Sequence, residues 1–60
     1  MILTDALGIS DYVRLRHWPE HRYWYYNKEK KQFEIPGTEI VRTVLTVDQA
    51  FAVDWEPYHI

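Results

Sequence analysis

The sequence predicts a small α+β domain: one domain over residues 1–60, with an antiparallel sheet of four or five strands and two short helices. From residue 11 onward, polar and apolar residues alternate with a period of two, which is typical of half-buried strands. The apolar spacing in residues 2–7 and a capping pattern at residues 46–49 indicate the two helices.

The size of the chain indicates self-association. A domain of 60 residues buries only about 60% of its unfolded surface and is marginally stable without a further stabilising element. The sequence has no cysteine, which excludes disulfides and thiolate zinc sites. We therefore expect a homodimer or homotetramer. No apolar run approaches the roughly 18 residues of a membrane span, and the opening residues do not read as a signal peptide, so a soluble cytoplasmic protein is expected.

The opening residues predict a helix of at most two turns, capped by Thr4 or Asp5 and ended by Gly8. A strand is predicted next, from Asp11 to Trp18, and Pro19 ends it. One face of that strand is aliphatic, and the other carries aromatic and basic side chains. The apolar face holds Val13 and Leu15, and the opposite face holds Tyr12, Arg14, Arg16 and Trp18.

Residues 22–27 are nearly all aromatic and predict a second strand, with Tyr23 and Tyr25 on one face and Trp24 and Tyr26 on the other. Residues 27–31 predict a hairpin loop of four or five residues. The chain then returns as a strand over residues 31–35, with Phe33 and Ile35 pointing inward, and reverses again at a type II turn over residues 36–37.

Two interpretations are open for residues 39–52. The β-branched residues of 39–45 favour a strand, whereas the apolar residues at 40, 44, 51 and 55 would also line one side of a long helix. We place the boundary at Thr46, because Thr46 and Gln49 have the spacing of a capping box, and expect a helix to about Ala52. A final strand over residues 53–58 is expected at a sheet edge.

The charge distribution narrows the class of ligand. The net charge of −2 argues against broad adhesion to a nucleic-acid polymer, which needs a basic face. Residues 1–31 hold six basic and four acidic residues, whereas residues 32–60 hold one basic and five acidic residues. This asymmetry fits a small anionic ligand or a contact between subunits.

The sequence gives little indication of a catalytic site or a metal site. His17, Glu20 and His21 have the H-x-x-E-H spacing of inverted zinc peptidases. Pro19 breaks the helix that would align the two histidines, so we expect two surface histidines, no metal site and no cofactor. Ser10 lies in a predicted turn with no evident base, and we do not expect an enzyme.

The predicted strand faces suggest where a ligand could bind. Arg14, Arg16 and Trp18 would present two planar cations beside a ring, which suits a phosphate with an attached base. On the residues alone, a solvated strand face is the simpler interpretation. Trp24 and Tyr26 would stack on a base or contact a second subunit, with the subunit contact favoured.

Two short motifs carry a family resemblance: Val13 to Trp18, written V-x-R-x-x-W with one shift in spacing, and A-x-D-W-E at residues 52–56. Together they resemble the second type of the Thoeris anti-defence family of small phage proteins. The resemblance implies a homo-oligomeric α+β domain that sequesters cyclic ADP-ribose-type immune signals or cyclic oligonucleotides. The chain departs from the family at Gln49, where an acidic residue is usual, and in its shorter middle.

We therefore expect a non-catalytic protein that binds a small cyclic nucleotide, in the host cytoplasm if the protein is phage-encoded. The expected ligand-binding residues are Arg14, Arg16, Trp18, Trp24, Tyr26, Asp54 and Trp55, the last two holding the pocket in shape. The alternative is an inhibitor that docks on a host enzyme through the aromatic strand. Single-strand nucleic-acid binding fits the aromatic residues but not the charge.

Overall fold

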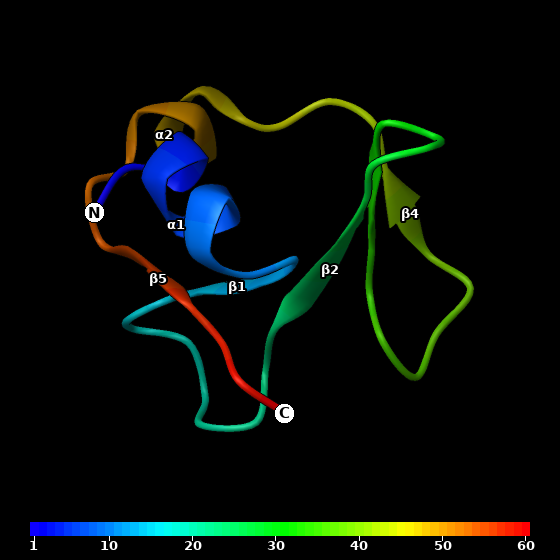
Figure 1. Cartoon of the computed structure of the whole chain (residues 1–60), viewed down its shortest axis with the longest axis horizontal. Coiled ribbons are helices and arrows are strands. Elements are labelled where there is room, and N and C mark those ends of the chain that lie inside the picture. Colours follow the sequence, from blue (N-terminus) through cyan, green and yellow to red (C-terminus); the bar gives the residue numbers. More distant parts are fainter.

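The alternation of buried and exposed residues produces a five-stranded antiparallel sheet in the order β4-β3-β2-β1-β5. The computed structural model describes all residues, 1–60 (Figure 1). The predicted fold class is confirmed. Along the chain the elements are α1 (Leu3–Ile9), β1 (Tyr12–Leu15), β2 (Trp24–Asn27), β3 (Gln32–Glu34), β4 (Val41–Arg42), α2 (Val47–Phe51) and β5 (Trp55–Pro57).

The core lies on one face of the sheet, under helix α1. It consists of six buried residues: Ala6, Val13, Leu15, Trp24, Phe33 and Trp55. Aromatic rings make up much of its volume, since Trp24 packs on Phe33 with ring centroids 5.5 Å apart and on Trp55 at 6.1 Å. The alternation predicted for the first two strands is confirmed where strand is present, because Val13, Leu15 and Trp24 all face this core.

Strand β1 is shorter than predicted. It ends at Leu15, because the chain turns there and the Trp18 amide donates to the Leu15 carbonyl at 3.0 Å. The alternation predicted that Trp18 shares a strand face with Arg14 and Arg16, and this prediction is wrong. Trp18 instead packs against the core, with its ring 5.1 Å from Trp24 and 5.6 Å from Trp55.

The caps predicted for helix α1 are wrong. The helix continues through Gly8 to Ile9, and its N-cap residue is Ile2, which makes no side-chain capping bond. The start of the chain is instead fixed by the Met1 ammonium group, which donates to the carbonyls of Val53 at 2.8 Å and Trp55 at 3.0 Å. The chain can therefore enter the helix directly, without Thr4 or Asp5 as a cap.

The short-range features of the second half are confirmed. Residues 28–31 form the loop of the β2–β3 hairpin, and Gly37 has the positive φ of 81° that a type II turn requires. Thr46 and Gln49 form the capping box of α2, which ends before Ala52. Strand β5 lies at a sheet edge. Neither helix has the length or apolar character needed to cross a membrane.

Candidate functional site

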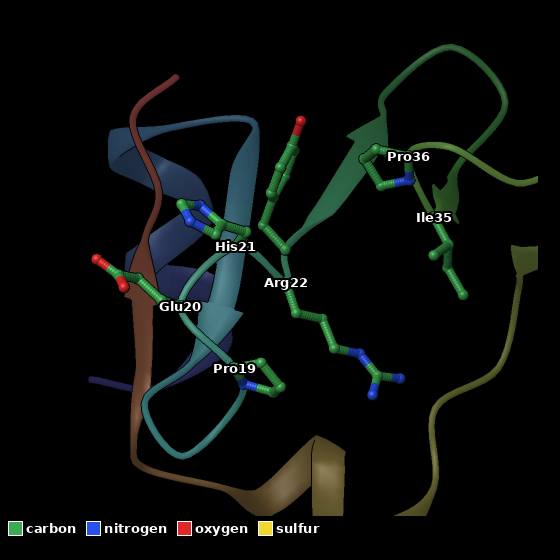
Figure 2. A pocket seen from close by; sticks show the side chains of 7 residues that line it. Pro19, Glu20, His21, Arg22, Ile35 and Pro36 are labelled. Carbon is green, nitrogen blue, oxygen red and sulfur yellow. The ribbon is translucent and has the colours of Figure 1, made fainter.

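A cleft of about 420 Å³ opens between the segment that leads into β2 and the turn after β3. Figure 2 shows Arg22 extending between Pro19 on one side and Ile35 on the other. The guanidinium of Arg22 lies among apolar surfaces there, whereas the side chains of Glu20 and His21 extend away from Ile35 and Pro36 (Figure 2). Its lining residues are Pro19, Glu20, His21, Arg22, Tyr23, Ile35 and Pro36.

Arg14 holds the loop that forms one wall of this cleft. Its side chain is only 14% exposed, and its guanidinium donates to the Trp18 carbonyl at 2.6 Å and the Glu20 carbonyl at 3.3 Å. Longer bonds of 3.4 Å reach the carbonyls of Leu15 and Arg16, and the Glu56 carboxylate lies 3.5 Å away. Arg14 therefore acts as an internal brace and has little surface left for a ligand phosphate.

The cation of the cleft is Arg22. The Cζ atom of Arg22 lies 5.2 Å from the ring centroid of Trp18, which is a cation–π distance. The Arg22 side chain is exposed and forms no ion pair. Trp18 is in turn fixed by its packing on Trp24 and Trp55. The guanidinium is thus held over a rigid ring and keeps its donors available.

Tyr23 gives the cleft a second fixed aromatic element. Its ring stacks on Tyr58 with centroids 4.4 Å apart and planes at 8°, and it meets Tyr12 edge-on at 5.8 Å. Tyr58 is tied to β1, because its amide donates to the Tyr12 carbonyl at 2.7 Å. The wall beside Arg22 is therefore anchored to both β1 and the segment that follows β5.

A second polar junction lies where β1 ends and β5 begins. The Asp54 carbonyl accepts from the Arg16 amide at 3.0 Å, and the Asp54 carboxylate lies 3.1 Å from Nδ1 of His17. The hydrogen bond from His17 lowers the pKa of Asp54 below its ordinary value. At the other end of the sheet, hydrogen bonds from Gln32 and Asn27 lower the pKa of Glu34. No group of three or more metal-ligating side chains is present.

The structure brings only part of the predicted site together. Trp18, Trp24 and Trp55 form one cluster, but Trp24 and Trp55 are 2% and 0% exposed and offer no surface to a ligand or a subunit. Tyr26 is half-buried and packs on Phe33, with ring centroids 4.9 Å apart. Asp54 is engaged with His17, and its carboxylate does not line the cleft.

Arg16 is the exposed member of the predicted arginine pair. Its side chain is 73% exposed, and its Nε atom lies 3.9 Å from Glu56. The same carboxylate faces Arg14, so an anion at this face would meet a negative charge between the two cations. The predicted pair therefore does not form a free phosphate site.

The predicted site did not include Arg22 and Tyr23, which give the cleft its cation and its aromatic lining. The available signal was Pro19, which was predicted to end the first strand and so to leave the following residues in a connection between strands. A turn is present in that connection, since the Arg22 amide donates to the Pro19 carbonyl at 2.9 Å.

Comparison of the chain with protein-family models, with curated proteins and with solved structures gives no match.

Proposed function

We propose that this chain is a non-catalytic binding protein that sequesters a small anionic, ring-bearing molecule of the cyclic nucleotide type, acting in the cytoplasm as a homo-oligomer. The observation that supports this most is Arg22, an exposed guanidinium without an ion pair, held over Trp18 at the border of the cleft. A planar guanidinium of this kind binds phosphate through two parallel hydrogen bonds.

The apolar lining residues suit the ring of such a ligand. Among the charged lining residues, Arg22 alone extends between Pro19 and Ile35, whereas the side chains of Glu20 and His21 extend to the opposite side (Figure 2). Pro19 and Pro36 offer apolar surfaces to a ring. The volume of about 420 Å³ lies within the roughly 300–1,000 Å³ typical of small-molecule sites.

Binding without bond breaking agrees with the contacts of the one serine. Ser10 Oγ donates to the Tyr58 carbonyl at 3.0 Å and accepts from the Tyr12 amide at 3.1 Å. These bonds hold the junction between α1 and β1 to the end of the chain. The hydroxyl therefore has a structural role and lies outside the cleft.

The alternative function, inhibition of a host enzyme through the aromatic strand, is less well supported. It needs the rings of β2 at the surface, yet Trp24 is buried and Tyr25 and Tyr26 are half-buried. Those rings are used within the domain, against Tyr12 and Phe33.

The proposal is tested by isothermal titration calorimetry of cyclic ADP-ribose isomers and of cyclic di- and trinucleotides, using protein confirmed free of carried-over ligand. A charge-assisted hydrogen bond contributes roughly 1.5–3 kcal/mol, so Arg22→Gln should weaken binding about 10- to 100-fold. The matched control is Arg16→Gln, which removes another exposed arginine that lies outside the cleft. Absence of wild-type binding at micromolar concentration contradicts the proposal. If Arg16→Gln weakens binding and Arg22→Gln does not, the ligand binds beside Arg16, at the junction between β1 and β5.

A further inference from the structure

Helix α2 has almost no packing of its own within the domain. It has five residues, none of them buried, and helices this short depend on tertiary contacts for their stability. What holds it is local: the capping box of Thr46 and Gln49, and the Trp55 indole N–H, which donates to the Gln49 carbonyl at 2.8 Å. Its outer side faces solvent with two large apolar residues, Val47 and Phe51.

These two residues belong to a larger apolar surface, which we call the α1–α2 face. Ile2 and Leu3 lie across a hollow of about 380 Å³ from Leu45 and Phe51, and no charged residue lines that hollow. Figure 1 shows α2 beside α1 and close to the N-terminus. The exposed members of the face are 43–81% exposed: Met1, Ile2, Val44, Val47, Phe51 and Val53.

The extent of the α1–α2 face is that of a subunit contact. A free aromatic side chain offers roughly 150–250 Å² and an aliphatic one less, so these six residues, which are 43–81% exposed, together present on the order of 500–800 Å² of surface. The largest apolar patch of an ordinary monomer covers about 300–600 Å². A stable protein–protein interface buries about 800 Å² on each partner, so the face can supply most of one.

We propose that the α1–α2 face is the contact between two copies of this chain, in a symmetric dimer in which Phe51 of each copy enters the hollow of the other. A two-fold contact requires a surface that is complementary to itself. This face meets that requirement, because the exposed ring of Phe51 stands at the edge of an uncharged hollow that it helps to line.

The small core favours a second copy over a different partner. Only six of 60 residues are buried, and a domain this small is marginally stable, so that further burial of apolar surface stabilises it whenever it is folded. A second copy is always present, whereas an unrelated partner is not. A membrane surface fits less well, since the exposed acidic residues Asp5 and Asp48 on the two helices repel anionic lipid headgroups.

This inference rests on the self-association part of the proposed function and is independent of the ligand. None of the residues of the α1–α2 face lines the cleft around Arg22. The two proposals can therefore fail separately.

Sedimentation equilibrium tests the contact at protein concentrations from about 1 to 100 μM. We expect wild-type protein to reach at least twice the chain mass of 7.3 kDa. Phe51→Glu should weaken association about 100-fold, because it buries a charge at the centre of the contact. The control is Ile60→Glu, which introduces the same charge at an equally exposed apolar residue at the distant C-terminus and should leave association unchanged.

The outcomes separate the claims. Wild-type protein that remains at 7.3 kDa throughout overturns the dimer and the oligomeric part of the proposed function, and leaves the face to another partner. An assembly that survives Phe51→Glu overturns the α1–α2 contact alone. If circular dichroism shows that Phe51→Glu is unfolded, the contact is tested instead on wild-type protein, by measuring amide hydrogen exchange before and after dilution to a concentration at which the dimer dissociates. Loss of protection over residues 47–51 supports the contact, and unchanged protection overturns it.

Discussion

Trp55 is the largest side chain in the domain with no exposed surface. Its ring contacts Trp18 and Trp24, and its indole N–H donates to the Gln49 carbonyl. Trp24 is buried beside it, but the indole N–H of Trp24 has no hydrogen-bond partner. Two buried tryptophans of the same core therefore differ in one hydrogen bond.

This difference predicts unequal effects of the same substitution. Trp55→Phe removes a hydrogen bond and leaves the Gln49 carbonyl without its donor, whereas Trp24→Phe removes an N–H group that is already unpaired. We expect Trp55→Phe to lower the free energy of unfolding by about 1–3 kcal/mol more than Trp24→Phe does. Urea denaturation of the two variants measures this difference in the free energy of unfolding. Equal losses of stability, or a larger loss for Trp24→Phe, would contradict the contacts described for these rings.

Arg14 gives a second prediction at the scale of single residues. Lysine at this position keeps the charge but cannot reach the carbonyls of Trp18 and Glu20 together. Arg14→Lys should therefore lower the free energy of unfolding by roughly 1.5–3 kcal/mol and increase amide exchange in residues 16–20. Arg16→Lys, at an exposed position, is the control, with an expected effect within about 0.5 kcal/mol. Equal effects of the two substitutions would show that Arg14 does not brace the loop.

At the scale of elements, the features that neighbouring residues determine could be predicted from the sequence. The capping box of α2, the turn at Gly37 and the alternation of β1 and β2 each depend on a few adjacent residues. The end of β1 was predicted three residues too late, because the alternation of residue types continues to Trp18 although the chain turns after Leu15. The course of the loop beyond that turn depends on Arg14 bonding to carbonyls up to six residues away. The cleft was missed for the same reason, since it forms only when that loop meets the turn after β3.

The junction between β1 and β5 gives a pH-dependent prediction. Asp54 has a lowered pKa in the folded chain, so its interaction with His17 stabilises the fold above the ordinary carboxyl pKa and is lost as the pH falls through the folded value. His17→Ala should raise the pKa of Asp54 toward its ordinary value and remove this part of the acid sensitivity.

Carbon-13 NMR titration of the side-chain carboxyl groups checks this prediction. Glu34 serves as an internal control, because its pKa is lowered by Gln32 and Asn27 and not by His17. An unchanged pKa of Asp54 in His17→Ala would show that the His17–Asp54 hydrogen bond does not form in solution.

At the scale of the whole molecule, the domain has two separate surfaces. The α1–α2 face is apolar, and the cleft around Arg22 is polar and aromatic. We propose that the first surface is the contact between two copies of this chain, which has only six buried residues, and that the second binds a small anionic molecule. The composition led us to expect a partner subunit and a small anionic ligand, but Trp24 and Trp55, two of the residues expected at these sites, are buried in the core.

The most direct test of the binding proposal is to map the ligand site by two-dimensional NMR, following backbone amides and arginine Nε–H signals while cyclic ADP-ribose isomers or cyclic oligonucleotides are added. We expect the largest shifts in residues 19–23 and 35–36 and at Nε–H of Arg22, and their disappearance in Arg22→Gln. Absence of shifts with every ligand, or shifts centred on Arg16 and Asp54 instead, would contradict a site in this cleft.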